Sequence, residues 1–305
     1  MGNSAPHVVA CVLTWNEYDD TKTCLKSLAA QTYAPLEVIL VDNNSTDGSI
    51  DRLRAEFPDV TIVENDRNLG FSRAQNEAIE RGLARDADYL WVLNNDIVLP
   101  PTVLERLVAE IEAAPSIGMI TPMIMDGEET WFSYGQVNRR SGHINAGPLA
   151  RLRRRLSRRD ADDRFIENDY APLCCLLVSA DVFRTVGLFP DPYFIYTEDV
   201  EFCLRAREAG FRVVTDSGLT VDHAASSSSG GDQNPLTNYY VARNRWLLQR
   251  RTESIRMHRF LPTYALWFWK RAALALLKRR PDGARALIEG TIDGTRNRTG
   301  KGRYP

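Results

Sequence analysis

Short apolar runs alternate with amphipathic stretches along the first third of the chain. The runs at 8–14, 36–41 and 89–94 are apolar and end in polar residues, which is typical of buried parallel strands. Between them, and around a shorter apolar run at 60–63, apolar residues recur at helical spacing; the predicted helices cover 18–30, 45–57 and 69–84. Such alternation predicts an α/β fold, with a mostly parallel central sheet flanked by helices.

The pattern continues with weaker periodicity to about residue 240. It predicts helices at 103–114, 180–186 and 200–209, strands at 117–125, 170–179, 211–215 and 219–221, and a hairpin or irregular insertion at 131–147. Helices are expected at 238–249 and 260–277, with a frayed end. We therefore expect one α/β domain over 1–240, with halves of about 1–125 and 126–240, and a helical C-terminal extension over 241–305.

The predicted C-terminal extension is strongly basic, whereas the rest of the chain is acidic. The net charge of −2 combines +12 in residues 241–305, from 16 Lys and Arg against 4 Asp and Glu, with −14 in the rest. The apolar stretch 260–277 is too short, and through Lys270 and Arg271 too charged, to span a bilayer. Residues 255–280 either lie as a peripheral helix in a headgroup layer or pack on the domain with their charges outward.

Cysteine usage and the N-terminus suggest a compartment. The five cysteines are an odd number without zinc spacing, so reduced thiols are expected. The first residues lack the basic and apolar regions of a signal peptide. We expect a cytoplasmic protein, peripheral on the inner face of the membrane if the extension binds lipid.

Polar residues follow four predicted strands where each ends, at 14–17, 42–48, 68–71 and 94–96. A single polar strand end is an ordinary turn, but the ends of parallel strands share one edge of the sheet, where α/β proteins bind ligands. Four segments rich in Asn and Asp suit a nucleotide with its sugar and phosphates. The oxygen donors of Asn94, Asn95 and Asp96 suit Mg²⁺ or Mn²⁺ held together with a phosphate ester.

Several other sites are excluded by missing motifs. The turn after the first strand lacks Gly-x-Gly-x-x-Gly, and the chain has neither a P-loop nor His-Glu-x-x-His. The block 151–159 holds six arginines without interleaved aromatic residues, so we expect no nucleic-acid partner. A sugar-1-phosphate nucleotidyltransferase would require a Gly-rich basic loop after the first strand, which is absent. A non-catalytic nucleotide- or glycan-binding protein stays an alternative.

A pair of carboxylates, Glu198 and Asp199, opens the predicted helix at 200–209. Acidic residues at a helix N-terminus stabilise the helix dipole without any function. The functional alternative is a general base that takes the proton from an attacking hydroxyl. His223 follows a later strand and is either structural, a metal ligand or a phosphate donor.

Taken together, these motifs resemble family 2 of the inverting glycosyltransferases, which have the GT-A fold. The resemblance covers about residues 8–244 and is specific only as an ordered set. The motifs are Thr14-x-Asn16-Glu17, Val41-Asp42-Asn43-x-Ser45-x-Asp47-Gly48, Asn68-x-Gly70-Phe71, Asn94-x-Asp96, Glu198-Asp199-x-Glu201-x-Cys203-x-Arg205 and His223. The stretches Asn68-Leu-Gly-Phe71 and Tyr239-Tyr-x-x-Arg243-Asn244 resemble the rhamnosyltransferase-like branch.

The resemblance implies a role for each matching residue. Asp199 would be the catalytic base, Glu198 would bind the acceptor, and Asp96 and His223 would hold the divalent metal, Mg²⁺ or Mn²⁺. The donor-binding residues would be Thr14, Asn16, Glu17, Asp42, Asn68, Asn95 and Arg243. One departure matters: relatives often carry Asp where Asn94 stands, and one carboxylate fewer weakens metal affinity.

The implied reaction is inverting, metal-assisted transfer of a sugar from a nucleotide-sugar donor to a hydroxyl. The donor would be a dTDP-, UDP- or GDP-sugar, and the acceptor a glycan or lipid-linked glycan. One displacement suffices, because the nucleoside diphosphate leaves as Asp199 deprotonates the acceptor.

Overall fold

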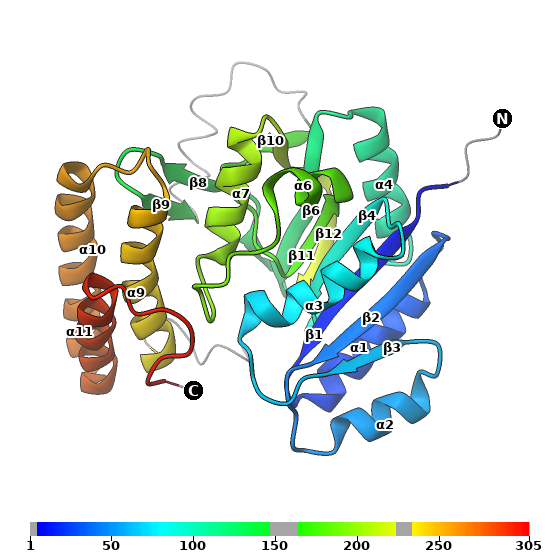
Figure 1. The fold of residues 1–305 in the computed structure, drawn as a ribbon, viewed down its shortest axis with the longest axis horizontal. Helices are drawn as coiled ribbons and strands as arrows, with labels where there is room; N and C mark the ends of the chain where they lie inside the picture. Colours follow the sequence, from blue (N-terminus) through cyan, green and yellow to red (C-terminus); the bar gives the residue numbers. More distant parts are fainter. Residues whose placement is uncertain (1–4, 147–163, 224–233, 305) are drawn as a thin grey trace.

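The computed structural model describes residues 5–146, 164–223 and 234–304. The arginine block at 151–159 lies outside these residues, as does most of the link between the last strand and the C-terminal helices. The described chain forms a central mixed sheet covered by helices, followed by three C-terminal helices at one end of the molecule (Figure 1).

The N-terminal half of the sheet is wholly parallel. Four strands lie in the order β4, β1, β2, β3; they are β1 Val8–Thr14, β2 Leu36–Asp42, β3 Thr61–Glu64 and β4 Tyr89–Asn94. Thr14 pairs with Asp42, and Leu13 pairs with Asn94, so the strands end at the same level. The predicted edge of polar strand ends is therefore present.

The second half of the sheet is mixed. Its main path runs β10, β12, β6, β11, and β11 joins β4 antiparallel. The strands are β5 Ile97–Val98, β6 Ile117–Asp126, β7 Glu129–Phe132, β10 Phe165–Glu167, β11 Cys175–Ser179 and β12 Arg212–His223; β5 pairs with β12, and β7 with β6. Strands β8 Gly135–Asn138 and β9 His143–Ala146 form a separate hairpin. The two short strands predicted at 211–215 and 219–221 are one strand, β12, interrupted by an irregularity in its pairing with β6.

Helices cover both faces of the sheet, and α3, α6 and α7 cross the face turned to the viewer in Figure 1. The helices of this part are α1 Tyr18–Ala29, α2 Ser49–Glu56, α3 Phe71–Leu83, α4 Val103–Ala113, α6 Ala180–Val186 and α7 Glu198–Glu208. The prediction started α2 four residues too early. Ser45 instead bonds Asp42, and the Asp47 side chain accepts from Ser49 N, so these residues form a turn before the helix.

The first two C-terminal helices, α9 Pro235–Arg251 and α10 Met257–Leu277, run antiparallel to each other and were predicted within a turn. The expected frayed end is wrong, because α11 Pro281–Thr295 packs tightly on α9. Gly290 and Gly294 make this approach possible: a Cβ on Gly290 would clash with the Tyr239 carbonyl group, and a Cβ on Gly294 would lie 2.8 Å from the Arg243 carbonyl oxygen. The expected boundary at residue 240 falls inside α9.

The glycine contact predicts the sign of a stability change. In a helix free of such contacts, Gly→Ala stabilises by about 0.5–1 kcal/mol. We expect Gly290→Ala to destabilise instead, by about 1–3 kcal/mol, because its methyl group must push α11 away from α9. Chemical denaturation measures the change, and an increase in stability would show that the two helices are not in close contact.

Candidate active site

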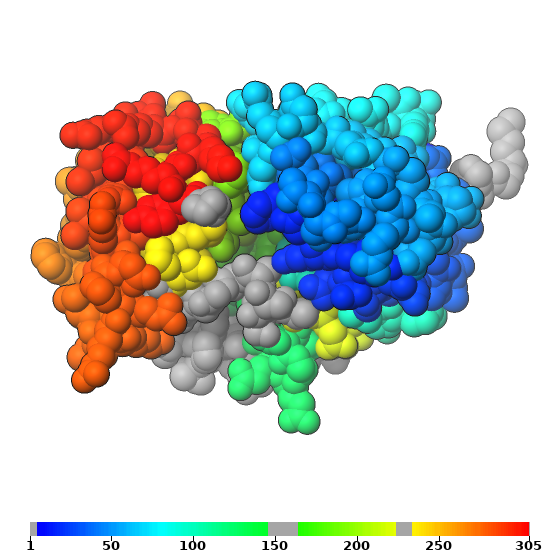
Figure 2. All heavy atoms as spheres, turned by 90° about the horizontal axis from the view of Figure 1, so that it is seen from below, coloured from blue at the N-terminus to red at the C-terminus, as the bar shows by residue number. Residues whose placement is uncertain are grey.

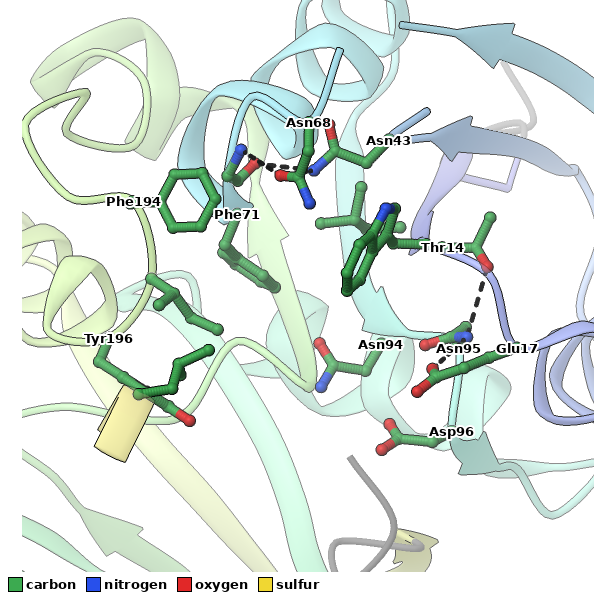
Figure 3. A pocket seen from close by; sticks show the side chains of 15 residues that line it. Thr14, Glu17, Asn43, Asn68, Phe71, Asn94, Asn95, Asp96, Phe194 and Tyr196 are labelled. Carbon is green, nitrogen blue, oxygen red and sulfur yellow. Dashed lines mark hydrogen bonds between the residues drawn. The ribbon is translucent and has the colours of Figure 1, made fainter. Parts of the chain in front are cut away.

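A cavity of about 250 Å³ opens where β1 and β4 end. Figure 3 shows its polar side chains on one wall and Phe71, Phe194 and Tyr196 on the facing wall. The lining residues are Leu13, Thr14, Trp15, Glu17, Asn43, Asn68, Gly70, Phe71, Asn94, Asn95, Asp96, Phe194, Ile195, Tyr196 and Leu236. Five of the predicted site residues, Thr14, Glu17, Asn68, Asn95 and Asp96, therefore share one cavity.

Asn43 fixes the loops that border the cavity. Its side-chain amide donates to Asn68 Oδ1 at 3.0 Å, and its Oδ1 accepts from the backbone N–H of Leu69 at 2.9 Å and from Asn65. Asn68 Oδ1 also accepts from Gly70 N at 2.9 Å (Figure 3). The Asn-Leu-Gly-Phe motif is thus held by a single buried amide, which the sequence analysis did not single out as a site residue.

Asn16 and Asp42 stand behind the cavity and do not line it. Asn16 has a left-handed backbone (φ 58°). Its backbone N–H donates to Ser45 Oγ at 2.7 Å, and its side-chain Oδ1 accepts from the backbone N–H of Thr46 at 2.9 Å. Asp42 accepts the backbone N–H of Ser45 at 3.1 Å. Asn16 thus ties the turn after β1 to the loop after β2, while Asp42 fixes Ser45 within that loop.

Asn95 joins the turn after β1 to the end of β4. Its side-chain amide donates to Glu17 at 3.1 Å and to Thr21 Oγ1 at 3.0 Å, and Thr21 shares a hydrogen bond with Thr14 at 2.8 Å. Burial is the main cause that raises the pKa of Glu17, with a smaller contribution from the charge of Asp96. A carboxylate destabilised in this way favours a nearby cation.

Asp96 and His223 meet although they are far apart in sequence. His223 Nε2 lies 3.1 Å from Asp96 Oδ1, and both side chains are almost fully buried. Pairing of β5 with β12 brings them together, since His223 pairs with Ile97. Trp131 contacts the His223 ring edge-on, with ring centroids 5.0 Å apart. Within the described ranges no group of three or more His, Cys, Asp or Glu side chains is arranged to hold a metal ion.

Glu198 and Asp199 stand at the N-terminus of α7 as predicted. Burial raises the pKa of Asp199 to about 6. The pKa of Glu198 lies well above its usual range, first because of burial and then because of the charge on Asp199. Burial thus disfavours the charged form of both carboxyl groups, and each also opposes ionisation of the other by its charge.

The segment before α7 forms the wall of the cavity opposite β1. Phe71 N donates to Phe194 O at 2.7 Å, and a Cβ on Gly70 would lie 2.5 Å from that same oxygen. Asn244 of α9 donates to the carbonyl oxygens of Ile195 at 2.8 Å and Tyr196 at 2.7 Å. The wall is thus fixed from both sides by backbone groups.

Arg243 does not reach the cavity. Its side chain is fully buried, donates to Gly300 O at 2.6 Å and to Asn244 Oδ1 at 3.0 Å, and lies over the ring of Tyr240. The expectation that it contacts donor phosphates fits this arrangement poorly, because leaving these contacts would break the link between α9 and the C-terminal tail.

Several lining residues were missed by sequence reasoning. Trp15, Asn43 and Phe71 lie inside the sequence motifs described above, so the motifs themselves were the available signal, although neighbouring residues were predicted instead. Phe194, Tyr196 and Leu236 carry no pattern that marks them. They reach the cavity only because the loop before α7 and the start of α9 fold over the sheet edge.

Comparison with known proteins gives a consistent family. Residues 9–187 match the model of "Glycosyl transferase family 2". A Mycobacterium tuberculosis N-acetylglucosaminyl-diphospho-decaprenol L-rhamnosyltransferase is 28% identical over 68% of this chain and 73% of its own length. The dTDP-rhamnosyl transferase RfbF of Shigella flexneri is 24% identical over 98% of both chains.

The fold has solved counterparts. A mannosyltransferase from Pyrobaculum calidifontis, solved in complex with GDP-Man and Mn²⁺, aligns with 96% of this chain and 88% of its own, with a TM-score of 0.58 and 17% identity. That likeness confirms the GT-A fold. Because the family model spans more than half of the chain, the chain belongs to glycosyl transferase family 2 and is a rhamnosyltransferase-like glycosyltransferase that uses nucleotide-sugars.

Proposed function

We propose that this enzyme transfers a deoxyhexose of the rhamnose type from a dTDP-sugar to a sugar carried on a lipid diphosphate, with inversion. The observation that carries the proposal is the single cavity at the ends of β1 and β4, which joins an amide-rich wall to Asp96. The names of the two relatives, a rhamnosyltransferase acting on a diphospho-decaprenol-linked sugar and a dTDP-rhamnosyl transferase, support the donor and acceptor classes.

The nucleoside fits the part of the cavity bounded by Thr14, Asn43 and Asn68. Amide and hydroxyl groups there offer both donors and acceptors to a base and its ribose. Trp15 is half-exposed at the rim, where its ring offers a stacking surface. Gly70 and Phe71 fix the floor beside it.

Asp96 and His223 are the groups that would hold a divalent metal. An oxygen and an imidazole nitrogen at 3.1 Å suit Mn²⁺ or Mg²⁺ only if further oxygens complete the shell, and a donor diphosphate carries them. Such a metal would neutralise charge on the leaving nucleoside diphosphate. With Asn94 in place of a second carboxylate, the protein alone supplies few ligands, which supports metal arriving with the donor.

Asp199 is proposed to accept the proton of the acceptor hydroxyl. The hydroxyl oxygen forms a bond to the anomeric carbon as the bond from that carbon to the diphosphate oxygen breaks. The proton goes to Asp199, and the electron pair leaves on the nucleoside diphosphate, so one displacement inverts the anomeric centre. Glu198, whose pKa is raised first by burial and then by the charge on Asp199, is proposed to hydrogen-bond the acceptor.

The cellular site is proposed to be the cytoplasmic side of a membrane that carries such an acceptor. All five cysteines are free and buried, which agrees with a reducing compartment. Among the described residues no helix combines the length and hydropathy needed to cross a bilayer.

The base assignment predicts the effect of one substitution. Asp199→Asn should lower kcat by about 10²- to 10⁴-fold while nucleotide binding survives, because the amide keeps the shape and loses the proton acceptor. Release of nucleoside diphosphate measures turnover. Asp191→Asn, on the exposed part of the same segment, is the matched control; near-normal turnover of Asp199→Asn would remove the base assignment.

The raised pKa of Asp199 predicts the acid limb of the pH profile. Since the ionised form is the base, kcat at saturating substrates should fall about tenfold per pH unit below about 6 and level off above it. Tyr170 and Cys203 lie near the group but stay neutral in this range, because burial raises the pKa of Cys203 to about 12 and raises the pKa of Tyr170 well above its usual range. A flat profile between pH 5 and 7 would contradict this role.

The donor site is tested by calorimetric titration of dTDP, UDP and GDP, each with and without Mn²⁺. We expect dTDP to bind most tightly and Mn²⁺ to strengthen it, and Asp96→Ala to abolish the effect of Mn²⁺. Asp19→Ala, an exposed carboxylate on α1, is the control. If Mn²⁺ leaves the affinity for nucleotide unchanged, the metal role of Asp96 is wrong. If UDP or GDP binds more tightly than dTDP, the donor is a UDP- or GDP-sugar instead of a dTDP-sugar.

A further inference from the structure

The outward face of α10 carries a continuous apolar stripe. Residues repeat at intervals of three and four along it and are all exposed; they are Met257, Leu261, Ala265, Leu266, Trp269, Ala273, Leu276 and Leu277. The exposed fractions reach 74% at Leu266, 69% at Trp269 and 78% at Leu277. At 1.5 Å per residue the stripe is about 30 Å long. Single exposed apolar residues are ordinary, whereas a stripe of this length marks a contact surface.

The opposite face of the same helix is already used. Phe260 and Tyr264 are buried, and Trp246 of α9 contacts both rings at centroid distances of 5.1 and 5.3 Å. Arg245 of α9 lies over the ring of Trp267 at 4.6 Å. The helix therefore packs on the domain through this face, and the residues of the outward stripe take no part in that packing. The alternative that this helix packs on the domain therefore describes its inward face, and the peripheral alternative stays a prediction for its outward face.

The charged residues of α10 have a single sign, since no Asp or Glu occurs in Met257–Leu277. Exposed cations stand near both ends of the stripe, Arg256 and Arg259 at its start and Lys278, Arg279 and Arg280 after its end. Ile288 and Ile292 of the neighbouring α11 add further exposed apolar surface. An apolar helix face edged by Lys and Arg complements a layer of anionic lipid headgroups over acyl chains.

We propose that the outward face of α10, with Ile288 and Ile292 of α11, docks this enzyme on an anionic lipid bilayer. Trp269 and the leucines enter the boundary between headgroups and acyl chains, and the terminal cations meet the headgroups. A second copy of the chain fits this face poorly. Antiparallel pairing would set Lys278–Arg280 against Arg256 and Arg259 of the other copy, and parallel pairing would set like clusters together.

The C-terminal helices lie at one end of the molecule, across a hollow from the N-terminal half in Figure 2. The docking proposal rests only on the C-terminal helices, so it stands or fails separately from the donor and acceptor proposed above.

The experiment is vesicle flotation of the full chain without substrates. The vesicles contain phosphatidylcholine alone or with phosphatidylglycerol. We expect binding to the anionic vesicles, weakened by salt, and little binding to the neutral ones. Leu266→Ser with Trp269→Ser and Leu277→Ser should weaken binding at least about tenfold, because three apolar side chains no longer enter the lipid. The side chains are exposed, so the fold should persist, and melting temperature and nucleotide binding check it.

A charge variant gives the second arm. Lys278→Gln with Arg279→Gln and Arg280→Gln should also weaken binding about tenfold or more. The matched control removes three positive charges from exposed positions of the α/β domain, through Lys26→Gln, Arg81→Gln and Arg184→Gln. This variant should bind the vesicles normally. Failure of the full chain to float with anionic vesicles, or equal loss in the control, would overturn the proposal. The proposal would also be overturned if analytical sedimentation showed a dimer of the full chain that Trp269→Ser dissociates.

Discussion

One backbone hydrogen bond joins the two halves of the cavity. Phe71 N donates to Phe194 O, and only a glycine at position 70 lets these chains approach so closely. On one side of this bond lie the loops that Asn43 organises, and on the other lies the segment that leads into α7. The amides that line the cavity and the carboxylates of α7 therefore keep a fixed relation, which the proposed displacement requires.

The C-terminal helices support that relation from outside the sheet. Asn244 binds two carbonyl groups of the segment before α7. Arg251 forms a two-pronged ion pair with buried Glu201 of α7, at 2.7 and 2.9 Å, and Tyr193 donates to the same carboxylate. Since the same helices present the apolar stripe, the face proposed to meet lipid and the wall of the cavity belong to one packed unit.

The acidic residues proposed for the site lie in different electrostatic surroundings. Asp96 stands beside a histidine where a cation would complete the pair. Asp199 stands beside Glu198, and burial raises the pKa of both. The proposed base and the proposed metal ligand thus belong to different elements of the fold, α7 and the end of β4.

The sequence by itself determined the alternation of strands and helices and the polar strand ends at Thr14 and Asn94, because period and turn chemistry are local. It also placed Asp199 at a helix start. Only the tertiary structure decided the rest. α11 is rich in glycine and has weak helical propensity, and close packing against α9 makes it a helix. The Arg243 side chain is buried because Gly300 O in the C-terminal tail accepts its hydrogen bond. No local sequence pattern encodes this contact, since the two residues are 57 positions apart.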